Sequence, residues 1–166
     1  MKRAFSLIEI LIVVAILGIL AAIVMPQFVS QSALAKEAAA KDNLRILRNA
    51  IELYAVQHNG IPPGYPGGNP SAMPSAAIFV LHLTKATNQS GQFANPGTDG
   101  YPYGPYLSDM PENPFNNSIF PSVIRNSGSF PVKATGNAGW IYKAANKEIR
   151  LDWPGTDEKG LPYYSY

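Results

Sequence analysis

The sequence contains no cysteine. Disulfides, thiolate metal sites and thiol catalysis are therefore excluded, whereas a location outside the cytoplasm is not. Charge is missing from one long stretch, because no residue between Glu9 and Lys36 is charged. The net charge is only +2 and the basic residues form no cluster. A nucleic-acid partner is therefore not expected.

Motifs for enzyme chemistry are also missing. The chain has no P-loop, no GxSxG and no GxGxxG. His58 and His82 are the only histidines and lie 24 residues apart, one beside a helix-stop glycine and one in an apolar helix. This pattern predicts a terminal histidine near a helix end and a satisfied core histidine, rather than a catalytic or zinc site. We expect a protein that is not an enzyme.

The most distinctive stretch present is Phe5 to Phe28. From Ile10 to Met25 every residue is apolar or glycine. A helix that is apolar on all sides belongs in a membrane or in a packed helical core. Glu9 lies inside the apolar end, and a carboxylate at mid-helix in lipid costs about 2.5–3.5 kcal/mol. Such a charge indicates a function and a partner.

The start of the chain leaves several processing routes open. Lys2 and Arg3 precede the apolar stretch, so the positive-inside rule places them in the cytoplasm and the rest across the membrane. Cleavage after the small-x-small site Ala33-Leu34-Ala35 would release a secreted domain. Cleavage between Ala4 and Phe5 would keep the apolar helix. Without cleavage the chain is a single-pass anchor.

The string FSLIEILIVVAILGILAAIVMPQF resembles the N-terminus of type IV pilins and type II secretion pseudopilins. The resemblance implies that a prepilin peptidase cuts between Ala4 and Phe5 and methylates the new amine of Phe5. It also implies that Glu9 guides assembly and that Pro26 kinks the helix. The family usually has glycine before the cut, where this chain has Ala4.

Physical chemistry supports a role for Glu9 in assembly. A carboxylate that loses its water needs a cation, because an unpaired buried charge is costly. Lys2 and Arg3 would leave with the leader, so the nearest new cation is the amine of Phe5, in the same subunit or in a neighbour. A pair between subunits would fix the register of stacked helices.

The helix is expected to continue to Gln57 and to bend or locally melt at Pro26. Its second half carries an apolar stripe at three- and four-residue spacing, which should pack on a domain. The stripe consists of Leu44, Leu47, Ile51 and Tyr54. His58-Asn59-Gly60 is a stop signal.

The rest of the chain is rich in proline and glycine. It predicts a short helix over 75–85 with Ser75 as N-cap, and a hairpin of 139–144 with 148–152. Weaker strands are expected at 123–125 and 130–133, and the aromatic tail 161–166 should pack on the sheet. The predicted fold class is α+β: a long N-terminal helix packed on a small antiparallel sheet with long loops.

Two features of this half bear on function. Residues 103–115 resemble the tract of major pseudopilins in which a Gly-Pro-Tyr-Leu-like run precedes a proline-rich turn, with Tyr106, Leu107 and Phe115 anchoring the loop.

The resemblance also implies a calcium site in the C-terminal loop. Asp152 and Asp157 are the candidate ligands, since carboxylates on a glycine-rich loop can bind calcium. A solvated acidic loop is the alternative, and no other cofactor is expected.

Together these observations predict a leader over 1–4, a transmembrane and filament-core helix over 5–28, and a pilin-like domain over 29–166. The resemblance implies a single-pass protein of the bacterial inner membrane with a periplasmic domain, whose subunits leave the lipid to form a helical homo-oligomeric filament in the periplasm or outside the cell. Its implied partners are the prepilin peptidase, an assembly platform with its ATPase, and minor pseudopilins. A surface pilin for adhesion, motility or DNA uptake is one alternative. An anchored or secreted binding domain is another.

Overall fold

The structure is a computed structural model that describes residues 6–166, without the side chains of residues 26–30. It divides into two compact units, Met1–Glu37 and Ala38–Tyr166. Helix α1 (Leu7–Gln57) contributes to both. The predictions for Ala4, Phe5 and Pro26 fall outside the described residues and side chains, so they remain predictions.

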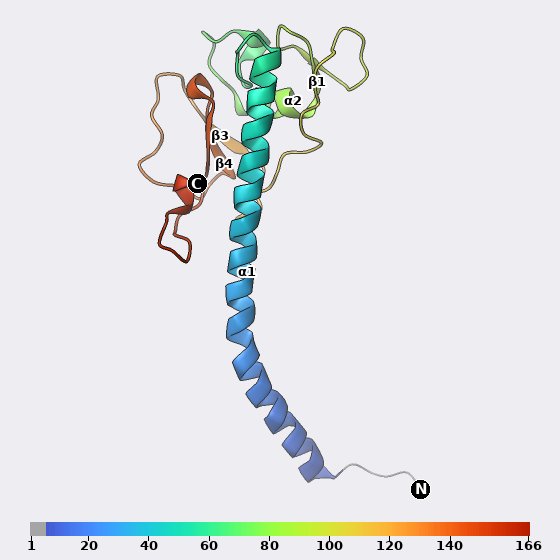
Figure 1. The fold of residues 1–166 in the computed structure, drawn as a ribbon, viewed down its shortest axis with the longest axis vertical. Helices are drawn as coiled ribbons and strands as arrows, with labels where there is room; N and C mark the ends of the chain where they lie inside the picture. The colour runs from blue at the N-terminus through green and yellow to red at the C-terminus, as the bar shows by residue number, and fades with distance from the viewer. Residues whose placement is uncertain (1–5) are drawn as a thin grey trace. The chain divides into compact units, whose positions relative to one another are not determined.

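The second unit is built on two layers, the last part of α1 and a three-stranded sheet (Figure 1). The buried side of α1 is the predicted stripe: Leu44, Leu47, Ile51 and Tyr54 are at most 1% exposed. They pack in one core with Trp140, Ile149 and Leu151 from the sheet. The stripe forms because residues three and four apart share one face of a helix.

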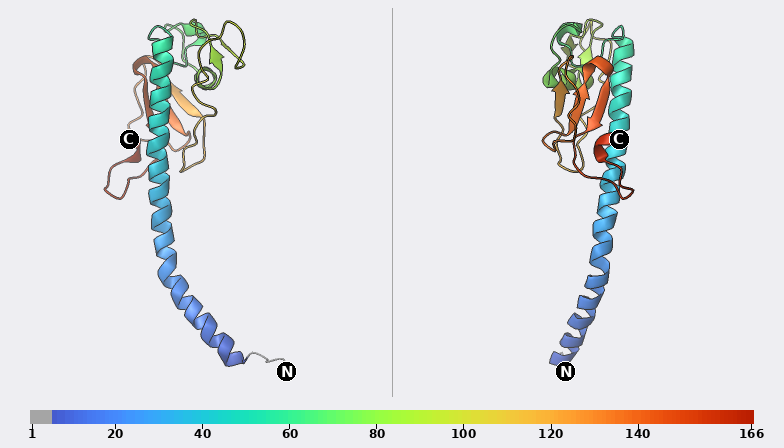
Figure 2. Two further views of the ribbon diagram at one scale, coloured as in Figure 1. Left: turned by 45° about the vertical axis from the view of Figure 1, so that its right-hand side comes forward. Right: turned by 90° about the vertical axis from the view of Figure 1, so that its left-hand side faces the viewer.

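The sheet has the order β3-β4-β5. The strands are β3 (Pro121–Ile124), β4 (Trp140–Lys143) and β5 (Glu148–Leu151). Strands β4 and β5 form the predicted hairpin, with Trp140 opposite Leu151, and they lie beside α1 in both views of Figure 2. Trp140, Ile141 and Tyr142 are consecutive buried residues of β4. The central strand is therefore covered on both faces.

The second face of the sheet is covered by loops and by the C-terminal tail. Ile141 packs there with Ala134 and Tyr164, against Ile124 and Phe130. The guanidinium of Arg150 lies 4.2 Å from the ring centre of Phe130. The aromatic tail thus packs on the sheet, as the sequence predicts, and includes the short 3-10 helix η3 (Tyr163–Ser165).

Helix α2 (Ala76–Thr84) matches the predicted second helix, with Ser75 at its N-cap position. The Ser75 side chain makes no cap hydrogen bond. Two further 3-10 helices, η1 (Pro66–Gly68) and η2 (Ala144–Asn146), lie in the connections. Helix α1 ends as predicted, because the Gly60 N–H, at a φ of 80°, donates to the Ala55 carbonyl over 2.8 Å.

The α+β fold is confirmed, and three details differ from expectation. Strand β3 runs parallel to β4, whereas the β4–β5 pair is antiparallel. Residues 130–133 are not a strand, because Phe130 packs under Arg150 instead of extending the sheet. Strands β1 (Ala86–Thr87) and β2 (Phe93–Ala94) pair in a region where only loops were expected. Strands of two residues leave almost no period-two signal.

Truncation of the core stripe should cost stability. We expect Leu47→Ala, at a fully buried side chain, to lower the free energy of unfolding by about 2–5 kcal/mol, because it removes apolar contacts and leaves a cavity. Leu53→Ala on the same helix is the matched control, since Leu53 is 50% exposed. Its cost should stay within about 0.5 kcal/mol. Chemical denaturation followed by tryptophan fluorescence measures both, and equal losses would contradict the packing described.

Candidate assembly site on the N-terminal helix

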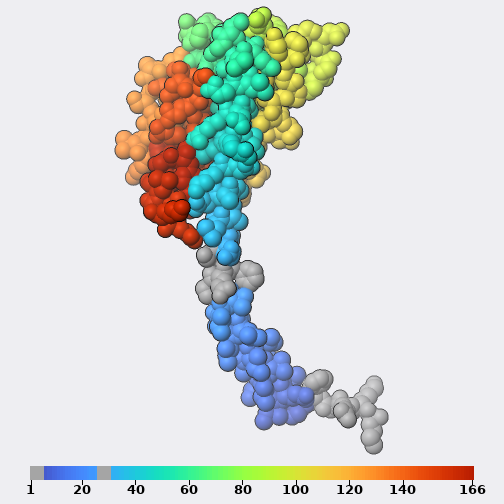
Figure 3. Space-filling view, in the orientation of Figure 1, coloured from blue at the N-terminus to red at the C-terminus, as the bar shows by residue number. Residues whose placement is uncertain are grey.

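The first unit presents an apolar surface with no internal partner. Every described side chain from Ser6 to Met25 is exposed. The stretch Leu7–Met25 is long and apolar enough to cross a membrane, and none of it is buried within the structure. Figure 3 shows these side chains in blue. In water such a surface is strongly unfavourable, so it must be covered by lipid or by other chains.

Glu9 lies in the first turn of α1. Its backbone N–H donates to the Ser6 carbonyl over 3.1 Å, and its side chain is exposed. A carboxylate in the first turn is favoured by the helix dipole, which places partial positive charge there. Within residues 6–166, Glu9 forms no salt bridge. The predicted cation partner, the amine of Phe5, lies outside the described residues.

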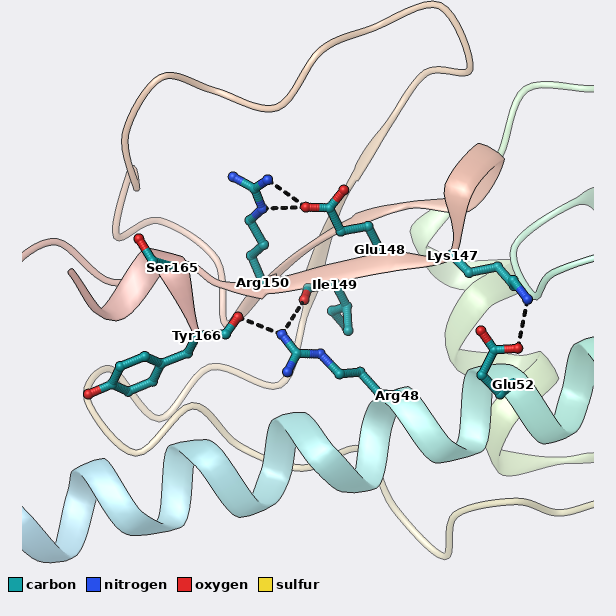
Figure 4. Close-up of a pocket in the computed structure, with 8 residues that line it drawn as sticks. All are labelled: Arg48, Glu52, Lys147, Glu148, Ile149, Arg150, Ser165 and Tyr166. Atoms are coloured by element: carbon teal, nitrogen blue, oxygen red, sulfur yellow. Dashed lines mark hydrogen bonds and ion pairs between the residues drawn. The ribbon is translucent and has the colours of Figure 1, made fainter. Parts of the chain in front are cut away.

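The second unit carries a groove of about 480 Å³ between α1 and β5 (Figure 4). Its charged side chains are occupied by one another or by the backbone. Lys147 binds Glu52 over 2.6 Å, and Arg150 binds Glu148. Arg48 donates to the carbonyl oxygen of Ile149, at the edge of the sheet. The Lys147–Glu52 and Arg48–Ile149 contacts join α1 to β5 and the residue before it, whereas the Arg150–Glu148 pair lies within β5. No nucleophile with an adjacent base lines the groove.

Both histidines are buried and lie close together, which their spacing in the sequence did not reveal. They stack on the ring of Tyr54, with centroid distances of 3.8 Å for His58 and 4.9 Å for His82. The predicted environments are found: His58 directly follows α1, and His82 is a core residue of α2 with both ring nitrogens in hydrogen bonds. The only local signal was the four-residue spacing of Tyr54 and His58, which places them on one helix face.

The histidine stack is held by hydrogen bonds to the backbone, and within it Nε2 of His58 is buried without a hydrogen-bond partner among the described residues. His58 Nδ1 bonds to the Tyr54 carbonyl, and His82 Nε2 bonds to the Gly91 carbonyl. Burial lowers the pKa of both imidazoles, that of His82 to about 4. Among the residues whose side chains the structure describes, no three His, Asp or Glu side chains lie close enough together to hold a metal ion. The neutral rings act as packing groups that join α1 and α2.

The calcium candidates lie at separate points of the C-terminal region. Asp152 directly follows β5 and is fully buried, and Asp157 lies in the loop that leads to η3. Hydrogen bonds from N–H and O–H groups lower the pKa of both carboxyls, although burial alone would raise it. Each carboxylate is therefore charged and already has partners within the chain.

Comparisons with known proteins agree with this geometry. Residues 1–25 match the family model described as the prokaryotic N-terminal methylation motif. The type II secretion system core protein G of Pseudomonas aeruginosa is 31% identical over 83% of this chain and 85% of its own length. The core protein G of Vibrio cholerae is 28% identical, over 83% of this chain and 82% of its own. The type IV major pilin protein PilA of Myxococcus xanthus is 54% identical, over 30% of this chain and 22% of its own. No solved structure matches the chain.

A methylation motif on an exposed apolar helix, together with a small α+β domain, defines a pilin-like protein. Its described residues include one candidate membrane span, Leu7–Met25. Among such proteins the likeness to core protein G extends over most of both chains. This chain belongs to the type II secretion system core protein G family, the major pseudopilins.

Proposed function

We propose that this protein is the structural subunit of a pseudopilus filament that serves type II protein secretion. The observation that carries the proposal is the fully exposed apolar face of Leu7–Met25, with Glu9 in its first turn. A helix of this kind can rest in lipid and then pack against copies of itself. The similar proteins of Pseudomonas and Vibrio are named for the type II secretion system, which supports that system as the place where this filament forms.

Processing would precede assembly. A prepilin peptidase would cut between Ala4 and Phe5 and methylate the Phe5 amine, in accord with the match of residues 1–25 to the methylation motif. Processing would remove the leader 1–4 and leave the helix 5–28 and the domain 29–166. Lys2 and Arg3 favour a cytoplasmic leader and a periplasmic domain in the inner membrane.

Assembly would move the apolar helix from lipid into the filament core. Because lipid and a helical core are both apolar, transfer of the side chains themselves costs little. The Glu9 carboxylate would pair with the methylated amine of Phe5 and set the register between neighbours. Pro26 would bend the helix. The driving force would come from a separate assembly platform and ATPase, and minor pseudopilins would join the filament.

The type IV pilin alternative has a specific observation in its favour, the 54% identity with the Myxococcus pilin. That match covers 30% of this chain, whereas the matches to core protein G cover 83% in Pseudomonas, Aeromonas and Vibrio proteins. Matches over 83% of the chain must include most of the domain 29–166, which a match over 30% cannot, so they favour a pseudopilus.

Deletion of the gene in its host bacterium tests the proposal. We expect enzymes that are normally released to accumulate in the periplasm, and a plasmid copy of the gene to restore their release. Surface pili and pilus-dependent motility should not change. Loss of pili with normal enzyme release would instead establish the type IV pilin alternative. A control strain without the assembly ATPase of the secretion system should show the same secretion defect as the deletion.

A further inference from the structure

Asp152, one of the two predicted calcium ligands, accepts hydrogen bonds from the protein at both of its carboxylate oxygens. Its Oδ1 accepts hydrogen bonds from the backbone N–H groups of Thr135 and Gly136, over 2.5 and 3.1 Å. Its Oδ2 accepts from the Thr135 hydroxyl at 2.6 Å and from the Ala138 N–H at 3.0 Å. A carboxylate offers about four lone-pair sites, and all four are used.

These donors join two parts of the sheet. Asp152 follows the last residue of β5, and the loop that it binds leads into β4. The backbone N–H of Asp152 also donates to the Gly139 carbonyl over 3.2 Å. The carboxylate therefore closes the open end of the β4–β5 hairpin and holds the long loop before β4.

The second carboxylate, Asp157, is held by its own loop. Its Oδ1 accepts from the backbone N–H groups of Lys159 and Leu161, over 2.9 and 2.8 Å. Its Oδ2 accepts from the Tyr166 hydroxyl at 3.0 Å. The positive charge of Lys41 on α1 further lowers its pKa. This carboxylate has both a set of donors and a nearby cation.

The groups around Asp152 and Asp157 are hydrogen-bond donors, whereas a calcium site needs oxygen ligands that are free to bind the ion. Calcium takes six to eight oxygen ligands at about 2.3–2.6 Å, and each carboxylate must direct lone pairs at the ion. Here hydrogens occupy those lone pairs, and converging N–H groups create the positive potential of an anion-binding nest. To bind the ion, buried Asp152 would have to give up its hydrogen bonds to the part-buried N–H groups of residues 135–138, which is costly. The residues do not fit calcium.

We infer that the C-terminal region of this protein is closed by its own hydrogen-bond donors at Asp152 and Asp157, and that its folding does not require calcium. The hairpin end and the 157–161 loop each carry a carboxylate of the kind that a calcium-dependent loop would use, but here hydrogen bonds from the protein stabilise the charge. This inference concerns the domain alone and does not depend on the proposed secretion function.

Thermal unfolding of the full chain in detergent, followed by the fluorescence of buried Trp140 and half-buried Trp153, tests the inference. Calcium at about 10 mM would fill most of even a weak site with a Kd of about 10⁻³ M. We expect the Tm in calcium and in excess chelator to agree within about 1 °C, because bound ligand would raise it. Asp152→Asn should lower the Tm by about 5–10 °C in both buffers, because its amide opposes N–H donors with further N–H groups. Asp109→Asn, at an exposed carboxylate, is the matched control and should leave the Tm unchanged.

Asp157→Asn provides a second test, which can be carried out even if Asp152→Asn does not fold. The amide oxygen can still accept from Lys159 and Leu161, so this variant should fold and, like the wild type, should not respond to calcium. Isothermal titration of calcium into the wild-type chain should show no binding heat. A Tm that rises by several degrees with calcium in the wild type, and does not rise in Asp157→Asn, would overturn the inference.

Discussion

The Glu9→Ala protein is expected to be processed and inserted in the membrane but not assembled into filaments. In the proposed filament core, the carboxylate of Glu9 neutralises the methylated amine of Phe5. Removal of one partner of a buried ion pair costs about 3–5 kcal/mol, because the other charge stays buried without compensation. Since about 1.4 kcal/mol is a factor of ten, each contact should weaken by about 100-fold or more. Electron microscopy of sheared filaments and cross-linking of neighbouring subunits measure the loss.

Two controls separate assembly from processing. The intact mass of wild-type and variant chains from the membrane fraction should correspond to a start at Phe5 with one added methyl group. Glu37→Gln, which changes a carboxylate of the same helix outside the apolar stretch, should assemble normally. Normal filaments from Glu9→Ala would refute the register role. A chain that begins at Lys36 would instead show a cleaved secretory signal and a free domain.

Mild acid is expected to destabilise the domain through its buried histidines. His82 is neutral in the folded protein, because Nδ1 accepts from the Gly64 N–H over 3.2 Å while Nε2 donates to the Gly91 carbonyl over 2.9 Å. Protonation of Nδ1 would break this hydrogen bond, because two N–H groups would then point at each other. Burial, with a smaller contribution from His58, lowers the pKa of His82 from 6.5 to about 4. The other groups around its ring, Tyr54 and Phe93, are uncharged in this range.

The direction of the pH effect follows from proton binding. The unfolded chain binds a proton at His82 below pH 6.5, whereas the folded chain resists it until pH about 4. The contribution of neutral His82 to stability is therefore complete above pH 6.5, falls between 6.5 and 4, and does not change further below pH 4. The depressed pKa corresponds to a loss of about 3 kcal/mol over this window. His58 acts in the same direction, since burial also lowers its pKa. Asp152 and Asp157 contribute at lower pH, where their carboxylates become protonated.

Denaturant unfolding of the full chain at a series of pH values measures this effect. His82→Gln should reduce the slope between pH 6.5 and 4, because glutamine cannot titrate but can still donate to the Gly91 carbonyl. His58→Gln should reduce the remaining slope, since His58 is the other histidine of the chain. If the unfolding free energy of His82→Gln changed with pH as steeply as that of the wild type, His82 in the wild type would be protonated in the folded protein over this range, and the prediction would be wrong.

Much of the candidate site could be predicted from the sequence. The run from Ile10 to Met25 has no residue that could face water, so its helix needed no tertiary information. The stripe through Leu47 and Tyr54 depends on helical spacing alone. Processing at Ala4 and Phe5 was inferred from resemblance, and it remains a proposal. The parallel pairing of β3 with β4 could not be inferred, because strand direction depends on the path of a long connection.

The sequence by itself determined the exposed apolar helix, Glu9 within it and the α+β class, because these follow from local composition and periodicity. The tertiary structure alone decided which polar side chains meet. Asp152 appears in the sequence as a candidate calcium ligand, and only the fold brings the N–H groups of Thr135, Gly136 and Ala138 to its oxygens. His58 and His82 meet on Tyr54 for the same reason. Contacts between residues distant in the chain depend on how layers pack, and residue spacing does not encode them.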